Sequence, residues 1–464
     1  MNFSQRALLP LVAALVLAGC ATATAPLPEA LPDLPVSFKQ ADGTAWTRSP
    51  DAPPAQGEWW KAFNDPALDA LLARAAQANT SVQAAAARLA QARALLKSAD
   101  AERLPQLGLG AGATREAQPA LGVAPRTVGS VGASLSYEVD LAGRLSGSSR
   151  AAALDARSRE ALLHSTRLLV QSQVAQAYFA LRALDAERTL VRDTVAAYRD
   201  TQNLIERRVR AGDVAELDLA RVRSEVAATE SEALALERQR TQLEHAIALL
   251  VGAPASAFTV DARADWAAPL PQVPAGVPST VLARRPDVAA AQDGLRAAQA
   301  RLGVAQAAWF PSLALTADGG FASTELSDLF RHAARAWSVG ALLSLPIFDG
   351  GRREAGVASA QAGLDGALAA YREQLLVAFK DVEDELAALR LLDAQGRTQA
   401  QAVEAATRAT TLSEARYRNG LVSQLELLDA RRSELRNRRQ SLQVKAAQYQ
   451  STVGLIKALG GGWG

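Results

Sequence analysis

The feature that most constrains this chain is an internal repeat, because two copies of one segment are expected to adopt two copies of one structure. Pro105-Gln-Leu-Gly-Leu109 matches Pro311-Ser-Leu-Ala-Leu315 at an offset of 206 residues. Four later matches share an offset of 208: Gly143-Arg144 with Gly351-Arg352, Val174–Arg182 with Val382–Arg390, Arg208–Gly212 with Arg416–Gly420, and Gly252 with Gly460. Five matches at a nearly constant offset are hard to obtain by chance, so we expect two equivalent halves.

The repeat and its flanking segments divide the 464 residues into six parts. We interpret them as a lipoprotein signal peptide at 1–19, a lipid-anchored extended tether at 20–57, a first structural repeat at 58–252, a Pro-rich linker at 253–278, a second repeat at 279–460, and a C-terminal tail at 461–464.

Each half has the order helix, two strand-like segments, then two helices. Helical patterning covers about 65–103, 145–211 and 213–250 in the first half, and 285–309, 351–419 and 421–459 in the second. At 1.5 Å per residue the longest helix would reach roughly 100 Å, which favours coiled-coil packing over an ordinary globular helix.

Four short segments between the first helices and the long ones alternate apolar and small polar residues. They are 106–114, 128–139, 312–317 and 337–345. A ten-residue segment with one apolar and one polar face is typical of a transmembrane β-strand, although a half-buried strand of a soluble sheet gives the same pattern. The expected fold class is a mixed α+β membrane protein, a long antiparallel helical coiled coil plus four transmembrane strands per chain. Four strands cannot close a barrel alone, so the chain must oligomerise if it spans a membrane. A dimer would supply eight strands and a trimer twelve, and the strand pattern does not choose between them.

The N-terminus has the pattern of a bacterial secretory signal. Arg6 precedes an apolar run of about a dozen residues that ends in Leu17-Ala18-Gly19-Cys20, and Cys20 is the only Cys in the chain. This ending resembles the lipobox cut by lipoprotein signal peptidase, which predicts a lipid on Cys20. An ordinary signal peptide with a Cys placed there by chance is the alternative.

Composition argues against several other functions. The 50 basic and 48 acidic side chains leave a formal charge of +2, which provides no basic field for nucleic acid. One Cys and three dispersed His residues make a His/Cys metal cluster improbable, and we expect no metal, no cofactor beyond the lipid, and no enzymatic activity. We interpret the acidic run at Asp381, Glu383, Asp384 and Glu385 as a solvated helix face.

Four sequence motifs carry a family resemblance. They are Glu58-Trp59-Trp60, Arg284-Arg285-Pro286-Asp287-Val288, Phe310-Pro311-Ser-Leu313 and Leu345-Pro346-Ile-Phe-Asp349-Gly-Gly-Arg352. Together they resemble a TolC-like outer-membrane efflux channel of the NodT or OprM lipoprotein type. The resemblance implies a homotrimer with a twelve-stranded barrel and a helical tunnel in the periplasm. It also implies a periplasmic adaptor and an inner-membrane pump of the resistance-nodulation-division type as partners.

The resemblance places a periplasmic gate at the turn between the last two helices. Glu426 and Asp429 lie on one helical face, and in a trimer they would form two stacked acidic rings. Asp218 and Tyr417 match positions that tie neighbouring coils together in closed family members. A solvated helix face is the alternative for the two acids.

The same two helical turns are the predicted adaptor contacts. Gly212 and Gly420 follow helix ends, where Gly can take the left-handed conformation that reverses the chain. Val214, Leu421 and Val422 would meet the adaptor tip to tip; simple packing on a neighbouring helix is the alternative. Val422 also stands where some members have a basic residue, so that ionic latch is missing here, and Arg418 or Arg210 could substitute.

The sequence leaves three functions open. The first is an outer-membrane exit duct for drugs or other small molecules. The second is an exit duct for type I protein secretion. The third is a structural coiled-coil lipoprotein with no pore.

Overall fold

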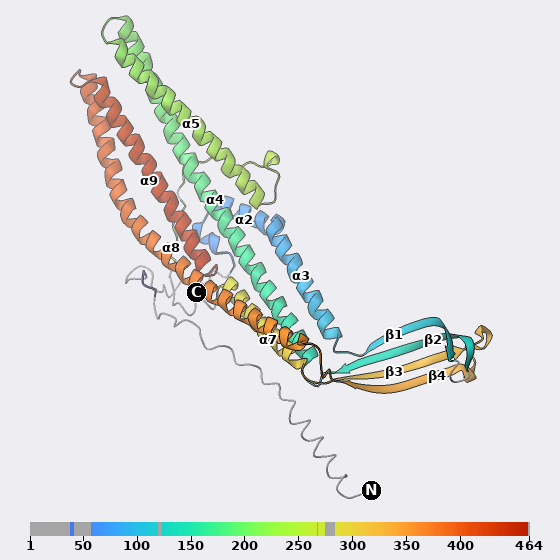
Figure 1. The fold of residues 1–464 in the computed structure, drawn as a ribbon. Helices are drawn as coiled ribbons and strands as arrows, with labels where there is room; N and C mark the ends of the chain where they lie inside the picture. The colour runs from blue at the N-terminus through green and yellow to red at the C-terminus, as the bar shows by residue number, and fades with distance from the viewer. Residues whose placement is uncertain (1–37, 41–56, 119–122, 267, 274–283, 463–464) are drawn as a thin grey trace. The chain divides into compact units, whose positions relative to one another are not determined.

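The structure is a computed structural model that describes residues 38–40, 57–118, 123–266, 268–273 and 284–462 (Figure 1). These residues belong to two compact units. The first combines Ala87–Ala161 with Ala289–Glu373, and the second combines the remaining described residues, which belong to 33–86, 162–288 and 374–464. Cys20 and almost all of the predicted tether lie outside the described residues.

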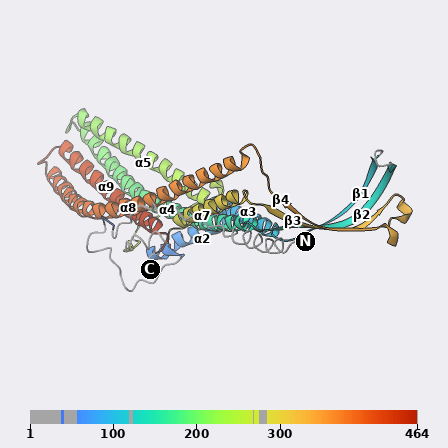
Figure 2. The same ribbon diagram turned by 60° about the horizontal axis from the view of Figure 1, so that its bottom comes forward.

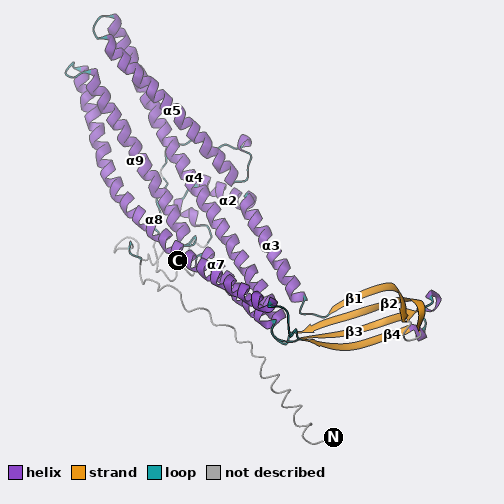
Figure 3. Cartoon of the chain, in the orientation of Figure 1, coloured by secondary structure: helices purple, strands orange, loops and turns teal. Residues whose placement is uncertain are grey.

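The first unit contains a four-stranded antiparallel sheet with the order β1-β2-β3-β4 (Figures 2 and 3). The strands are β1 (Gln106–Gln118), β2 (Val123–Val139), β3 (Ser312–Ser323) and β4 (Arg335–Ser344). β2 and β3 pair across the two repeats, with Leu135 opposite Ala317. All four predicted segments form strands, and each strand is longer than the alternating segment that predicted it.

The register places two chemically different surfaces on the two faces of this sheet, because side chains alternate along each strand. One face is apolar and includes Leu107, Leu109, Val131, Leu135, Tyr137, Leu313, Leu315, Trp337, Val339 and Leu343. The other is mostly small and polar and includes Gly108, Gly110, Ser130, Ser134, Ser136, Thr316, Asp318, Ser338 and Ser344.

Glycine is required at the middle of the β2–β3 pair, where the two backbones lie very close together. Gly132 lies opposite Gly320, and a Cβ on Gly320 would overlap the backbone of Val131 and Gly132. The two strands approach closely only because neither position carries a side chain.

Four helices precede or follow the strands in the chain and contribute to the first unit. They are α3 (Thr80–Ala101) before β1, α4 (Arg144–Arg210) after β2, α7 (Pro286–Ala307) before β3 and α8 (Arg352–Arg418) after β4. α4 and α7 approach closely at Gly147, where a Cβ would lie 2.9 Å from Val304 Cγ2. The hydroxyl of Ser158 on α4 also donates to the carbonyl oxygen of Ala290 at 2.9 Å.

The second unit consists of two long helical hairpins. α4 is 67 residues long and precedes the 35-residue α5 (Glu216–Leu250); α8 is also 67 residues long and precedes the 35-residue α9 (Gln424–Ala458). The second pair begins and ends 208 residues after the first, so the repeat predicted from sequence is confirmed at the level of helix ends. Within the part of the chain that is described, no helix is both long enough and apolar enough to cross a bilayer.

An aromatic cluster forms part of the core of the second unit. Phe63, in the 3₁₀ helix η1 (Trp59–Phe63), packs on Phe179 of α4 with ring centroids 4.8 Å apart. Phe179 also contacts Tyr449 of α9 at 4.8 Å, and Tyr449 contacts Trp266 at 4.4 Å. Trp266 belongs to the Pro-rich segment between the repeats, so this segment contributes a buried side chain to the core.

A buried group of ion pairs joins α4 to α5, and one of its arginines also binds the connecting segment. Asp185 is buried and pairs with Arg182 and Arg188 at 3.2 Å and with Arg240 at 2.9 Å. Arg182 also donates to the carbonyl oxygen of Asp261 at 2.6 Å. Buried charges of this kind are tolerated because each has a partner.

The first helix of the first repeat is broken, contrary to the single helix expected over 65–103. α2 (Pro66–Ala78) ends before Asn79, whose side chain accepts hydrogen bonds from the N–H groups of Ser81 and Val82 at 2.9 and 3.1 Å. Asn79 therefore caps α3, and its amide also donates to the Leu250 carbonyl at 2.8 Å. Helical patterning on both sides of this cap hides the break in the sequence.

The acidic run on α8 is only partly a solvated face. The Glu383 carboxylate accepts hydrogen bonds from the backbone N–H groups of Lys39 and Gln40, at 2.6 and 2.9 Å. Asp381 pairs with the buried Arg285 at 3.2 Å. Glu385 is also partly buried, against Gly454 of α9, so the interpretation as a solvated face was wrong for Asp381, Glu383 and Glu385.

Candidate functional site

The candidate site comprises the two turns that close the helical hairpins of the second unit. Gly212 follows α4 with φ +80°, and Gly420 follows α8 with φ +70°. After each glycine a backbone N–H reaches back to the last helical turn, from Asp213 to Arg208 and from Leu421 to Arg416, both at 2.9 Å. Both turns therefore use the left-handed C-cap expected from the sequence.

The predicted gate acids lie beside the second turn and are accessible to solvent. Glu426 is in the first turn of α9, and its side chain is 49% exposed; it pairs with Arg416 at 3.6 Å. Asp429 is 61% exposed and pairs with Arg432 at 3.4 Å. Exposed pairs of this length contribute about 0–1 kcal/mol, so both carboxylates can exchange partners.

The other two predicted gate residues have separate partners within one chain. Asp218 pairs with Arg221 at 3.7 Å on α5. The Tyr417 hydroxyl accepts a hydrogen bond from the Arg208 guanidinium at 3.5 Å, which joins α8 to α4. The arginine that contacts Tyr417 is therefore Arg208. Arg418, which was a candidate to replace the missing ionic latch, instead pairs with Glu414 on its own helix at 3.6 Å.

Three arginines of α9 link the two hairpins, and we call them the α9 clasp: Arg431, Arg432 and Arg439. Arg431 donates to Thr201 of α4 at 2.9 Å and pairs with Glu414 of α8 at 2.8 Å. Arg431 lies two residues after Asp429, so the predicted gate acids are close in sequence to the contact between the hairpins.

The other two clasp residues reach α5 and α4. Arg432 pairs with Glu225 of α5, and its Nε lies 2.8 Å from Glu225 Oε2. The hydrogen bonds that Arg432 donates to Glu225 raise the pKa of Arg432. Arg439 pairs with Glu187 of α4 at 2.7 Å and with Glu232 of α5.

An apolar cluster lies beneath these contacts. Leu428 of α9 is 1% exposed and packs with Tyr198 and Ile205 of α4 and with Leu219 and Val222 of α5. Burying a leucine side chain contributes about 1.5–3 kcal/mol, more than any of the exposed ion pairs. This apolar contact and the partly buried ion pairs of the α9 clasp together join the hairpins.

The predicted adaptor contacts differ in exposure. Leu421 is 67% exposed, whereas Val214 is partly buried and packs against the Leu428 cluster. The sequence analysis missed Leu217 and Leu425, which are 59% and 42% exposed and occupy equivalent positions in the two repeats. Their 208-residue offset was the feature that could have identified them.

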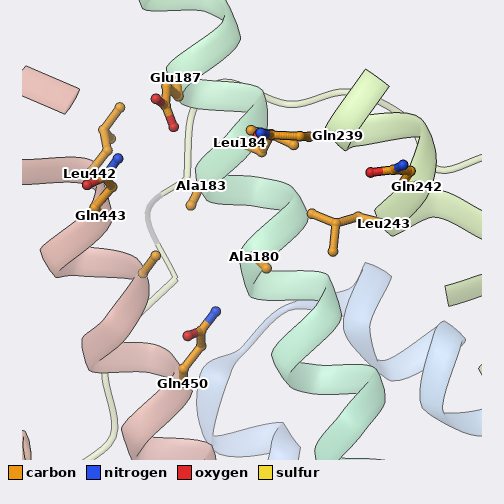
Figure 4. A pocket seen from close by; sticks show the side chains of 11 residues that line it. Ala180, Ala183, Leu184, Glu187, Gln239, Gln242, Leu243, Leu442, Gln443 and Gln450 are labelled. Atoms are coloured by element: carbon orange, nitrogen blue, oxygen red, sulfur yellow. The ribbon is translucent and has the colours of Figure 1, made fainter. Parts of the chain in front are cut away.

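A groove of about 400 Å³ lies between α4, α5 and α9 (Figure 4). Its lining is mainly Ala, Leu and Gln side chains, among them Ala183, Leu243 and Gln443. Glu187 is the one ionisable residue among those that line it, and it is held by Arg439. The groove therefore presents packing surface and amide groups to a neighbour.

Comparison with known proteins assigns the family. The model of the family described as "Outer membrane efflux protein" matches residues 71–253 and 277–461, which is most of the chain. The chain belongs to this family. It acts in efflux at the outer membrane.

Curated relatives support the same assignment. Outer membrane protein OprJ of Pseudomonas aeruginosa is 34% identical over 329 residues, which cover 70% of this chain and 68% of OprJ. The probable efflux pump outer membrane protein TtgC of Pseudomonas putida is 32% identical over 462 residues, which cover 97% of this chain and 94% of TtgC.

Solved structures of two channels have a similar fold. The outer-membrane channel OprN superposes with a TM-score of 0.88 at 29% identity, over 95% of this chain and 100% of that one. The CmeC outer membrane channel of Campylobacter jejuni gives 0.86 at 25% identity, over 94% of this chain and 93% of that one. The predicted family, efflux function and outer-membrane location are confirmed.

Proposed function

We propose that three copies of this chain form the passive exit duct of a tripartite efflux system. The observation that carries the assembly is the four-stranded sheet, whose strands β1 and β4 are edges within one chain. Unpaired sheet edges are not tolerated in lipid. Pairing β1 of one copy with β4 of the next would satisfy both edges, and three copies would supply a closed barrel of twelve strands.

The partners follow from the proposed duct. A passive channel needs an energy source, which we assign to an inner-membrane pump of the resistance-nodulation-division type, reached through a periplasmic adaptor. Several relatives carry names that refer to small molecules, including an antibiotic efflux pump protein and a pyoverdine export protein. These names support drugs or other small molecules as cargo. The chain itself would perform no catalysis.

Cys20 is the proposed lipid anchor of each copy. Leu17-Ala18-Gly19-Cys20 supports this assignment, since it has the lipobox pattern and contains the chain's one thiol. Two or more acyl chains on one N-terminus suffice for stable membrane attachment. Mass spectrometry of the mature N-terminus checks the modification, and an unmodified Cys20 would contradict it.

The assembly is tested on the purified full-length protein in detergent and in planar bilayers. Native mass spectrometry should give a three-chain species that heat dissociates to one chain, and bilayers should show discrete conductance steps. A stable single chain without conductance would contradict the duct and favour a non-pore lipoprotein.

The resting gate is assigned to Glu426 and Asp429. Both are exposed beside the second turn and weakly paired, so in a trimer they are free to face the pore mouth. We also assign Asp218 and Tyr417 to contacts between neighbouring hairpins. The α9 clasp and Leu428 would hold the mouth narrow by keeping α9 against α4 and α5.

Replacing both gate acids by Ala should widen the mouth and remove its cation preference. We expect single-channel conductance to rise and antibiotic leak into cells to increase. Asp393→Ala is the matched control, because Asp393 is also 61% exposed and pairs with an arginine of its own helix. Conductance and leak equal to wild type in the double variant would remove the gate assignment.

The adaptor contact is assigned to the exposed apolar residues of both turns. Leu421 is retained from the sequence prediction, and Leu217 and Leu425 are added because they are exposed. Gly212 and Gly420 shape the turns, and Val422 lies beside Leu421. Replacing Leu217 and Leu425 by Ser should weaken co-purification with the adaptor; unchanged co-purification would argue against this surface.

A further inference from the structure

The polar face of the sheet carries one carboxylate at mid-strand. Asp318 is the seventh of the twelve residues of β3, and its side chain is exposed. It lies opposite Ser134 on β2 and Ser338 on β4. The Ser338 hydroxyl donates a hydrogen bond to Asp318 Oδ2 at 3.1 Å. The sheet therefore holds this carboxylate with a neutral partner.

The other acids on this face are neutralised by arginines at the ends of the strands. Glu116 pairs with Arg126 at 2.7 Å, and Glu138 pairs with Arg144 at 2.8 Å. Asp318 has no such ion pair among the described residues. Its negative charge is therefore available to mobile ions.

The orientation of Asp318 follows from the opposite face. Residues one position away, such as Ala317 and Val339, belong to the apolar face. Lipid contacts the apolar face, so the face with Asp318 must border the water-filled interior if the sheet lines a pore.

We propose that Asp318 sets a cation preference in the membrane-spanning part of the duct, separate from the preference assigned to the periplasmic gate. This inference rests on the proposed trimeric duct, in which three Asp318 carboxylates would lie at one depth. No bound ligand is needed, because the effect is a local electrostatic potential.

The size of the effect follows from Coulomb attraction with salt screening. In a twelve-stranded barrel the carboxylates would lie about 10 Å from the pore axis. Three charges at that distance raise the cation concentration on the axis about twofold at 0.1 M salt, and hardly at all at 1 M. The ratio of cation to anion permeability should therefore change about fourfold at 0.1 M.

The test measures reversal potentials of the full-length protein in planar bilayers under a KCl gradient. The background is Glu426→Ala with Asp429→Ala, which removes the gate charges. Asp318→Asn should lower cation preference about fourfold near 0.1 M, with almost no change near 1 M. Asp318→Glu should retain the preference, and Asp318→Lys should favour anions.

Failure of the duct and failure of the Asp318 inference would give different results in the bilayer measurement. Wild-type protein without any channel contradicts the duct itself. A conducting Asp318→Asn channel with unchanged reversal potential overturns the inference and leaves the duct intact. Asp393→Asn, which removes an exposed carboxylate of α8, is the matched control and should have no effect.

A second measurement applies if Asp318→Asn does not insert. Ser338→Cys and Val339→Cys are neighbours on β4 that lie on opposite faces. A charged, membrane-impermeant thiol reagent should alter conductance through Ser338→Cys and leave Val339→Cys unchanged. Modification of Val339→Cys alone would place Asp318 away from the water-filled interior and overturn the inference.

Discussion

At the scale of single residues, Glu385 shows how close packing of two helices perturbs an acid. The Glu385 carboxylate of α8 occupies the space where a Cβ on Gly454 of α9 would lie, so the glycine makes room for it. Burial raises the pKa of Glu385, although a hydrogen bond from Ser451 and the charge of Lys457 lower it. The carboxylates of Asp381 and Asp384 add to the rise.

This raised pKa predicts a pH-dependent stability. The folded state holds the Glu385 proton more tightly than the unfolded chain does. Protonated Glu385 therefore contributes its full share to the free energy of unfolding below pH 4.5, the ordinary glutamate pKa, and this share is lost as pH rises through the pKa of the folded state. Glu385→Gln should therefore melt at a higher temperature than wild type at pH 7, with the difference shrinking toward pH 4. Asp393→Asn, at an exposed site of the same helix, is the control. A difference independent of pH would contradict the assignment.

At the scale of elements, the two hairpins differ at the start of their second helices. The Ser423 hydroxyl caps α9 by accepting a hydrogen bond from the Glu426 N–H at 3.3 Å. The equivalent residue before α5 is Ala215, which provides no side-chain cap. The tip of the second hairpin is therefore the better secured of the two.

Exchanging these caps should shift local stability in opposite directions. Ser423→Ala should cost about 1 kcal/mol at the start of α9, and Ala215→Ser should stabilise α5 by a similar amount. Hydrogen exchange of the first-turn amides should become about fivefold faster in the first variant and slower in the second. Exchange rates equal to wild type in both variants would show that these caps do not determine the local stability of the hairpin tips.

The helices were largely predictable because their pattern is long and periodic. The expected helix at 145–211 differs from α4 (Arg144–Arg210) by one residue at each end. Strand β2 was underestimated because Pro125 and Arg126 interrupt the alternation, yet Arg126 stays in the ladder opposite Glu116. The alternation of residues within one segment gives no information about its pairing with another strand.

The candidate site was only partly predictable for a similar reason. The repeat and the family motifs identified Glu426 and Asp429, but the Arg432–Glu225 contact joins residues 207 positions apart and depends on hairpin packing. Gln424 reads as an ordinary polar residue of a first helical turn. The structure buries it, and neither amide atom has a hydrogen-bond partner among the described residues.

At the scale of the whole molecule, the apolar face of the sheet is left uncovered by the rest of the described chain. Leu109 and Trp337 on the apolar face of the sheet are 89% and 80% exposed. Apolar side chains concentrated on one sheet face mark a surface that contacts lipid or protein. The sheet and the hairpins belong to different units, so substitutions at Asp318 and at the gate should affect permeation independently.

The matched helix lengths of the two repeats limit how this protein can evolve. Both long helices have 67 residues and both return helices have 35. An insertion confined to one hairpin would make it longer than the other, and the two turns would then no longer match as the proposed adaptor contact. Lineages that acquire a longer or shorter reach must therefore gain or lose the same number of helical turns in both halves of the gene.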